Sequence, residues 1–234
     1  IGFGQFAHSI RRGVNMTYIV ENNGVYGLTK GQFSATADRG SKSKKGLINN
    51  DSPIDLVAIA LQLGASFVAR SFSGDKTQLV PLIAAAIQHK GAAFIDVISP
   101  CVAFNNHAGS TKSFDYVREH NDAVNRLDVI SGRDPITVDY APGTVQLVEQ
   151  HDGTRIALRK IDADYDPHDR VGAMSFLQKH AARGQIVTGL LFVDPESDDL
   201  HSHLDTVEAP LNTLDAGELC PGNAALEKIN ASLR

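Results

Sequence analysis

Residues 15–32, NMTYIVENNGVYGLTKGQ, place an apolar strand pattern directly before a loop rich in polar groups. Asn22 and Asn23 follow the apolar run, and two glycines, a tyrosine and Lys30 come within the next seven residues. A turn needs only one or two residues with suitable backbone dihedral angles, so these carboxamide, hydroxyl and ammonium groups exceed what a turn requires. The loop is therefore the first candidate for a functional site.

Helix and strand patterns alternate at short spacing around this segment. Helices are predicted at 1–13, 52–64, 75–91, 114–127 and 170–183, strands at 15–20, 66–70, 92–99 and 185–194, and a hairpin at 144–161 that turns at Asp152-Gly153. This alternation predicts an α/β fold, a mainly parallel sheet with helices on both faces. Ligands bind such sheets outside the carboxyl ends of the strands, where the loops 21–32 and 99–113 belong.

The ends of the expected helices carry recognisable signals. Ser52 as the N-cap, followed by Pro53 in the first helical position, predicts the start of one helix. Asp75 as an N-cap predicts the start of another. The first helix has neither an N-cap nor a preceding strand, so we expect the sequence to begin inside a strand–loop–helix unit. We assign residues 1–193 to one domain and 194–234 to an acidic C-terminal tail.

The composition limits the class of protein. The chain has 234 residues, 42% of them hydrophobic, with a formal net charge of −5, which suits one ordinary domain and argues against a nucleic-acid partner. No apolar run approaches the ~18 residues of a membrane span. Cys101 and Cys220 are the two cysteines, too few for a disulfide framework, and this count favours a reducing cytoplasm.

Gly2-Phe3-Gly4-Gln5-Phe6-Ala7 has the outline of a dinucleotide-binding motif, with Glu21 about 20 residues further on. The motif requires a strand before the glycines, and here they fall within the helix pattern itself. Close helix packing is the other interpretation of Gly2 and Gly4. An NAD-dependent dehydrogenase domain therefore stays as an alternative function.

The loop after the first strand has donors suited to Mg²⁺, which prefers hard oxygen ligands in near-octahedral geometry. The side-chain oxygen of Asn23 and the carbonyl of Val25 would give two adjacent ligands. Gly27 would let the backbone approach a diphosphate cofactor, with Leu28 beside it. In the alternative interpretation, the segment is a polar turn in which Asn22, Asn23 and Gly24 only adopt left-handed dihedral angles.

Three stretches carry a resemblance to a known family. The segment IGFGQFAHSIRRGVNMTYIVENNGVYGLTKGQ, with FVARSFSGDK and SPCVAFN, resembles the beta subunit of 2-oxoacid:ferredoxin oxidoreductases, which binds thiamine diphosphate. The resemblance covers residues 1 to about 130 and implies the thiamine-diphosphate-binding fold. In that family, a Gly-Asp-Gly-Asp loop that this sequence lacks precedes the first helix and supplies a further Mg²⁺ ligand.

The resemblance implies roles for six residues. Asn23 and the carbonyl of Val25 would coordinate Mg²⁺, and Gly27 and Leu28 would contact thiamine diphosphate. Lys30 would face the substrate, although it can also be an ordinary surface lysine. Cys101 in SPCVAFN would be the fourth ligand of a [4Fe–4S] cluster whose other three thiolates lie outside this sequence. A small buried hydrophobic residue is the alternative for Cys101.

The resemblance also implies an activity. A 2-oxoacid, with 2-oxoglutarate favoured, would be oxidatively decarboxylated to an acyl-coenzyme A, and the electrons would pass through the cluster to ferredoxin. An alpha subunit would complete the active site at a subunit interface. Specificity for pyruvate or for a broad range of 2-oxoacids is the alternative within the family. A cofactor-free structural partner is the alternative outside it.

Overall fold

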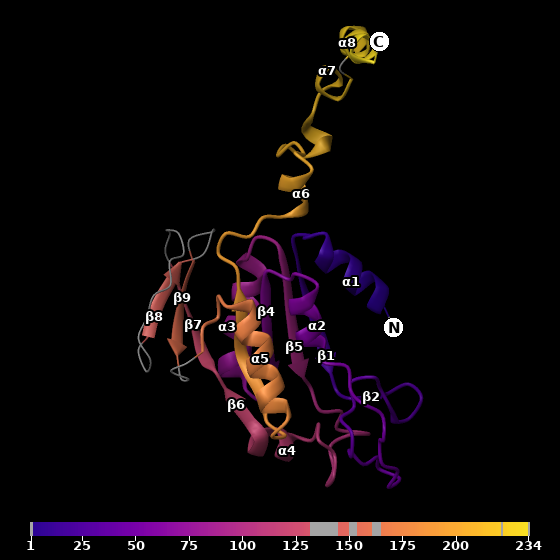
Figure 1. Ribbon diagram of the computed structural model, residues 1–234, viewed down its shortest axis with the longest axis vertical. Helices are drawn as coiled ribbons and strands as arrows, with labels where there is room; N and C mark the ends of the chain where they lie inside the picture. The colour runs from indigo at the N-terminus through magenta and orange to yellow at the C-terminus, as the bar shows by residue number, and fades with distance from the viewer. Residues whose placement is uncertain (1, 132–144, 150–153, 161–164, 221, 234) are drawn as a thin grey trace. The chain divides into compact units, whose positions relative to one another are not determined.

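The computed structural model describes residues 2–131, 145–149, 154–160, 165–220 and 222–233. The chain forms two compact units, Ile1–Leu200 and His201–Arg234, and each is described by itself. The first unit contains the sheet and its covering helices (Figure 1). The domain boundary expected from the sequence lies seven residues earlier than this division, between residues 193 and 194.

A five-stranded sheet forms the centre of the first unit. Its strand order is β1 (Met16–Asn22), β5 (Ala92–Ile98), β4 (Phe67–Phe72), β10 (Ile186–Val193) and β6 (Asn121–Ala123). β5 runs parallel to both β1 and β4, and β10 runs parallel to β6 but antiparallel to β4. The predicted mainly parallel sheet is therefore confirmed, and the antiparallel β4–β10 pair was not foreseen.

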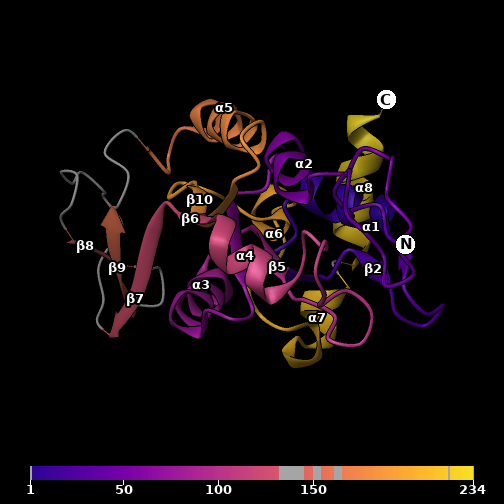
Figure 2. The same cartoon turned by 90° about the horizontal axis from the view of Figure 1, so that it is seen from below.

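Helices cover both faces of this sheet, as expected. α1 (Phe3–Arg11), α2 (Leu56–Gln62) and α5 (Arg170–Ala181) contribute to one core cluster with residues of β1 and β5. α3 (Lys76–Gln88) packs its Leu82, Ala85 and Ala86 on the opposite face. Figure 2 shows α2 and α5 on one side of the sheet and α3 on the other. The apolar periodicity of α1, whose Phe6 and Ile10 are buried, explains which face that helix buries.

Smaller elements complete the first unit. β2 (Val25–Tyr26) and β3 (Gln32–Phe33) pair as a short antiparallel ribbon, and α4 (Phe114–His120) follows the loop after β5. A second sheet has the order β7 (Asn125–Ser131), β9 (Thr154–Lys160) and β8 (Val145–Glu149), and β7 contacts α3. The predicted hairpin strands are thus confirmed, while its turn at Asp152-Gly153 lies outside the described residues.

Several local predictions were wrong. α2 begins at Leu56 with Asp55 as its N-cap, rather than at Ser52-Pro53, because the Asp55 carboxylate accepts hydrogen bonds from the backbone N–H groups of Val57 and Ala58. The helix expected over 114–127 ends at His120, because residues 121–123 pair with β10 instead.

The close-packing interpretation of Gly2 and Gly4 in the first helix also needs correction. Phe6 and Ile10 are buried, but Phe3 is about half exposed. A Cβ atom added at Gly2 or Gly4 would meet nothing within 4 Å among the described residues. Close packing against a neighbouring element therefore does not explain these two glycines.

The second unit consists of short elements. α6 (Leu200–His203) spans the division between the units, and η1 (Leu211–Thr213), α7 (Ala216–Leu219) and α8 (Gly222–Ser232) follow it. Asp215 and Glu218 form a capping box at the start of α7. No side chain in 201–220 or 222–233 is buried. In the described part of the chain, no helix has the length and hydrophobicity needed to cross a membrane.

Candidate active site

The loops that follow β1 and β5 leave the sheet side by side at its carboxyl edge. The two strands are parallel and Asn22 pairs with Ile98, so the loops 23–31 and 99–113 begin at the same level. The backbone N–H of Ser99 donates to the carbonyl of Asn22 at 2.9 Å, which fixes this start. The placement expected from the alternation of helices and strands is confirmed.

Asn23 is half-buried at the base of the first loop. Its side-chain Oδ1 accepts the backbone N–H of Val25 at 3.1 Å, and its backbone carbonyl accepts Nδ2 of Asn105 at 2.8 Å. The contact with Val25 makes an asparagine turn. The left-handed conformation that the alternative interpretation expected occurs at Gly24, with a φ of 71°, but not at Asn22 or Asn23. The same Oδ1 keeps lone-pair capacity for a second partner, so this turn and metal ligation are compatible.

The tip of this loop is exposed. The backbone N–H of Gly31 donates to the carbonyl of Tyr26 at 2.9 Å, and that of Lys30 donates to Gly27 at 3.1 Å, so the tip closes on itself. The Leu28 side chain is 98% exposed, and a Cβ at Gly27 would meet nothing within 4 Å. Lys30 is exposed and has a φ of 70°, which costs a non-glycine residue about 1–2 kcal/mol.

Cys101 lies at the start of the second loop and is half-buried, with a free thiol. Its backbone carbonyl accepts the N–H groups of Phe104 at 3.2 Å and Asn105 at 2.8 Å, so residues 101–105 form a compact turn. A Cβ at Gly31 would lie 3.1 Å from Cβ of Phe104. The Cys101 turn therefore packs directly against the loop that carries Asn23 and Lys30.

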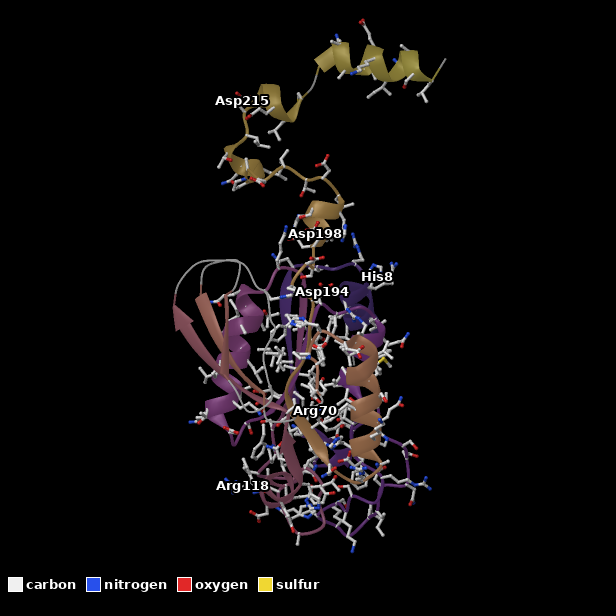
Figure 3. All side chains as sticks on the ribbon, turned by 60° about the vertical axis from the view of Figure 1, so that its left-hand side comes forward. His8, Arg70, Arg118, Asp194, Asp198 and Asp215 are labelled. Carbon is white, nitrogen blue, oxygen red and sulfur yellow. The ribbon has the colours of Figure 1, made fainter. Side chains whose placement is uncertain are left out.

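A buried ion pair supports the edge of the sheet below these loops. Arg70, two residues before the end of β4, donates from Nε to Asp96 at 2.9 Å and from Nη2 to Asp55 at 2.6 Å. Asp96 in β5 has a side chain that is only 2% exposed, and its Oδ1 accepts Nδ2 of Asn22 at 3.1 Å. Figure 3 shows Arg70 among the side chains of the sheet and its covering helices. This network, from Asp55 through Arg70 and Asp96 to Asn22, holds the residue before Asn23 in place.

The charges of this network stabilise one another. Burial alone would disfavour the ionised form of Asp55, but Arg70 and the N–H groups of Ala58 and Val57 outweigh it and lower the pKa of Asp55. Burial likewise opposes the charge of Arg70, and Asp55 and Asp96 together raise the pKa of its guanidinium. Asp55 and Arg70 therefore both stay ionised at neutral pH.

A cavity of about 590 Å³ lies beside the base of the first loop. Its lining includes Asn22, Arg70, Asp96, Lys112 and Gln185, but none of residues 23–31. Lys112 donates from Nζ to Asp38 at 2.6 Å, so its charge is paired. The exposed loop tip and this cavity are thus separate places at the same edge of the sheet.

The residues at this edge fit a hydrated metal–diphosphate group better than a metal cluster. Asn23 offers a hard oxygen, and the open backbone at Gly27 leaves room for a cofactor to approach. Among the described residues, no group of three or more His, Cys, Asp and Glu side chains could hold a metal ion. A [4Fe–4S] cluster needs four ligands, and the chain has two cysteines, so these residues alone do not form one.

Comparison with known proteins supports the same interpretation. Residues 1–97 match the family described as thiamine pyrophosphate enzyme, C-terminal TPP binding domain. The chain is 44% identical over 139 residues to the 2-oxoacid:ferredoxin oxidoreductase subunit beta of Saccharolobus solfataricus, an alignment covering 58% of this chain and 43% of that protein. This chain is a relative of the 2-oxoacid:ferredoxin oxidoreductase beta subunits. The resemblance predicted from the sequence is confirmed.

A second relative of this beta-subunit type is the 2-oxoglutarate oxidoreductase subunit KorB of Mycobacterium tuberculosis. It is 35% identical over 158 residues, which cover 67% of this chain and 40% of that protein. The chain therefore spans less than half the length of these two beta subunits.

A solved structure confirms the fold. The 2-oxoglutarate:ferredoxin oxidoreductase from Magnetococcus marinus, with 2-oxoglutarate, coenzyme A and succinyl-CoA bound, matches 91% of this chain and 60% of that chain. The TM-score is 0.62 at 24% sequence identity, so the likeness concerns the fold alone. It confirms the predicted thiamine-diphosphate-binding fold of this beta-subunit relative.

Sequence reasoning missed the residues that support the two loops. Asp96 inside the apolar run AAFIDVIS and Arg70 at the end of SFVAR are charged residues in buried strands, and charged side chains are rarely buried unless paired. That signal could have predicted their ion pair. Asn105 is the last residue of the quoted SPCVAFN, but nothing local shows that its partner is Asn23.

Proposed function

We propose that this chain is the thiamine-diphosphate-binding part of the beta subunit of a 2-oxoacid:ferredoxin oxidoreductase. The full enzyme would oxidatively decarboxylate a 2-oxoacid, with 2-oxoglutarate favoured over pyruvate or a broad substrate range. Coenzyme A would be the co-substrate that receives the acyl group, and ferredoxin would accept the electrons. An alpha subunit would complete the active site.

The observation that carries this proposal is the pair of loops at the carboxyl edge of β1 and β5. The loop with Asn23, Gly27, Leu28 and Lys30 lies within residues 1–97, which match the thiamine pyrophosphate family. The names of the relatives in Saccharolobus solfataricus and Mycobacterium tuberculosis support the reaction class, and the second favours 2-oxoglutarate.

Each proposed residue has a physical role. Oδ1 of Asn23 and the carbonyl of Val25 would bind Mg²⁺, whose charge would hold the diphosphate. Gly27 would leave room for the cofactor, and the exposed Leu28 would cover its apolar ring. The ammonium of Lys30 would pair with the substrate carboxylate. Bound thiamine diphosphate would supply the nucleophilic carbon and the electron sink for decarboxylation.

We propose Cys101 as one thiolate ligand of a [4Fe–4S] cluster, with the remaining three supplied from outside this sequence. Its place beside the Asn23 loop supports this role, because Gly31 packs against Phe104 of the same turn. Cys101 is a free, half-buried cysteine, so ligands from outside this sequence could approach it.

The proposal is tested by calorimetry of thiamine diphosphate binding to the full-length complex, with and without Mg²⁺. The wild-type complex should bind only with Mg²⁺, and Asn23→Ala should weaken this binding by at least tenfold because one hard oxygen ligand is lost. Asn15→Ala is a matched control, since the Asn15 side chain accepts the backbone N–H of Gly91, which lies before β5 and away from the loop. Its binding should equal that of the wild type.

Two results would contradict the proposal. Unchanged Mg²⁺-dependent binding by Asn23→Ala would mean that this asparagine is a turn residue only. No binding of thiamine diphosphate by the wild-type complex would reject the thiamine function. Binding of NAD without Mg²⁺ would then favour the nicotinamide alternative.

A further inference from the structure

Asn105 joins the two loops that the proposed function assigns to Mg²⁺ and to the cluster. We propose that Asn105 is a positioning residue that holds the Asn23–Val25 segment in the geometry that binds Mg²⁺ and couples this segment to the Cys101 turn. The inference rests on the proposed function, and it adds a residue to which neither the comparisons nor the predicted site assigns a role.

The contacts of Asn105 reach both loops. Its Nδ2 donates to the backbone carbonyl of Asn23 at 2.8 Å, and its backbone N–H donates to the carbonyl of Cys101 at 2.8 Å. Its Oδ1 accepts the hydroxyl of Ser110 at 2.7 Å. The residue is 2% exposed, so water does not compete for these bonds. A displacement of either loop therefore changes a buried hydrogen bond of Asn105.

The carboxamide of Asn105 satisfies both side-chain contacts at once. The amide group offers a donor to Asn23 and an acceptor to Ser110 at the same time. An aspartate would keep the acceptor but place a carboxylate oxygen against the carbonyl of Asn23. An alanine would leave that carbonyl without this partner, and an unpaired buried polar group is costly.

The backbone next to Asn23 shows how closely the loops meet. A Cβ atom at Gly24 would lie 3.2 Å from Nδ2 of Asn105 and 3.1 Å from Cγ of Lys112. Lys112 is itself held by its ion pair with Asp38. The peptide after Asn23 therefore rests on residues of the second loop, and Asn105 sets the direction of its carbonyl.

This direction matters for the proposed metal site because Asn23 and Val25 are its ligands from this chain. Asn105 contacts a ligand residue rather than the metal, as an outer-shell group does. Loss of such partners typically weakens metal affinity 10–100-fold. We therefore expect Asn105→Ala to weaken Mg²⁺-dependent binding of thiamine diphosphate by that factor.

The test uses the full-length complex and two measurements. Calorimetry gives the Mg²⁺ concentration dependence of thiamine diphosphate binding, and hydrogen–deuterium exchange without ligand follows the backbone amides of residues 23–26. Asn105→Ala and Asn105→Asp should both require 10–100-fold more Mg²⁺ and show faster exchange. Asn105→Gln, which keeps both functional groups, should recover part of the affinity.

Asn106→Ala is the matched control, since Asn106 lies in the same loop but accepts only the backbone N–H of Phe114. It should bind Mg²⁺ as the wild type does. Faster exchange in Asn105→Ala with unchanged Mg²⁺ dependence would overturn the inference, because the contact would then be structural only. Wild-type complex that binds no thiamine diphosphate would instead reject the proposed function.

The coupling to Cys101 has its own signature. Addition of Mg²⁺ and thiamine diphosphate to the reduced wild-type complex should change the electron paramagnetic resonance spectrum of its cluster. Asn105→Ala should reduce this change even at Mg²⁺ concentrations that saturate the variant. An equal spectral change in variant and wild type would show that the two loops are not coupled through Asn105.

Discussion

At the scale of single residues, Gly24 meets two separate constraints. Its φ is 71°, in the left-handed region that costs other residues about 1–2 kcal/mol, and a Cβ atom would also crowd Lys112 and Asn105. We expect Gly24→Ala to lower the free energy of unfolding by about 2–4 kcal/mol, since the crowding adds to the backbone cost. Urea unfolding followed by circular dichroism measures this change.

Gly184 provides a control with the same backbone conformation. Its φ is also 71°, but an added Cβ would meet nothing within 4 Å. Gly184→Ala should therefore cost only the backbone strain of about 1–2 kcal/mol. Equal losses of unfolding free energy in both variants would contradict this prediction. They would show that steric crowding at Gly24 adds nothing to the cost of backbone strain.

At the scale of elements, the start of α2 depends on the carboxylate of Asp55, which makes two kinds of contact. Asp55 caps the helix and also pairs with Arg70. Asparagine caps helices about as well as aspartate, so Asp55→Asn removes the ion pair and keeps the cap. Because the Asp55 side chain is 38% exposed, solvent screens the pair, and we expect a loss of about 1 kcal/mol at pH 7.

The pH dependence of this loss follows from the pKa of Asp55. The folded state lowers that pKa below the ordinary value of 3.8, so the charged carboxylate favours folding. The stabilisation is complete above about pH 5 and is lost as the pH falls through the folded pKa. Wild type and Asp55→Asn should therefore differ in stability at pH 7, and the difference should shrink as the pH falls below 3.8 towards the folded pKa.

Urea unfolding at a series of pH values from 7 to 3 measures the difference. Asp115→Asn is the control, because the Asp115 side chain is 99% exposed and its contact with Arg118 is 4.0 Å long. Its effect should be close to zero at every pH. A constant difference between wild type and Asp55→Asn across the series would contradict the role of the charge.

At the scale of the whole chain, residues 194–200 belong structurally with the first unit. Within that unit, the N–H of Asp194 donates to Ser66, the hydroxyl of Ser197 donates to the carbonyl of Lys90, and the N–H of Leu200 donates to Gly13. These bonds fasten the segment along the amino edge of the sheet. The domain boundary expected from the sequence after residue 193 would separate residues 194–200 from the hydrogen-bond partners that they have in the first unit.

Two shortened chains test where the first unit ends. A chain that stops at Leu200 should keep the stability of the first unit within about 0.5 kcal/mol, because no described side chain beyond it is buried. A chain that stops at Val193 should lose about 1–3 kcal/mol, since it loses several hydrogen bonds near the buried His89. Thermal and urea unfolding compare the two with the full chain. Equal stability of both shortened chains would support the earlier boundary.

The sequence by itself determined the helices and strands with strong periodicity. The strands predicted at 66–70 and 92–99 exist as β4 and β5, and α3 starts after Asp75 as predicted. The two candidate-site loops also lie at the predicted carboxyl edge. These features depend on side chains that are close in sequence, such as apolar repeats and an N-cap. The resemblance of residues 1 to about 130 to the beta-subunit family was likewise recognised from short sequence motifs.

Only the tertiary structure decided the features that depend on distant partners. Ser52 and Asp55 are both good N-cap residues, and α2 starts at Asp55, where the carboxylate also meets Arg70 from another strand. Residues 121–123 form a strand because β10 lies beside them. Asn105 and Asn23 are 82 residues apart, and their hydrogen bond exists because two parallel strands bring their loops together. A local pattern cannot specify such contacts, since their free energy arises only when the chain has folded.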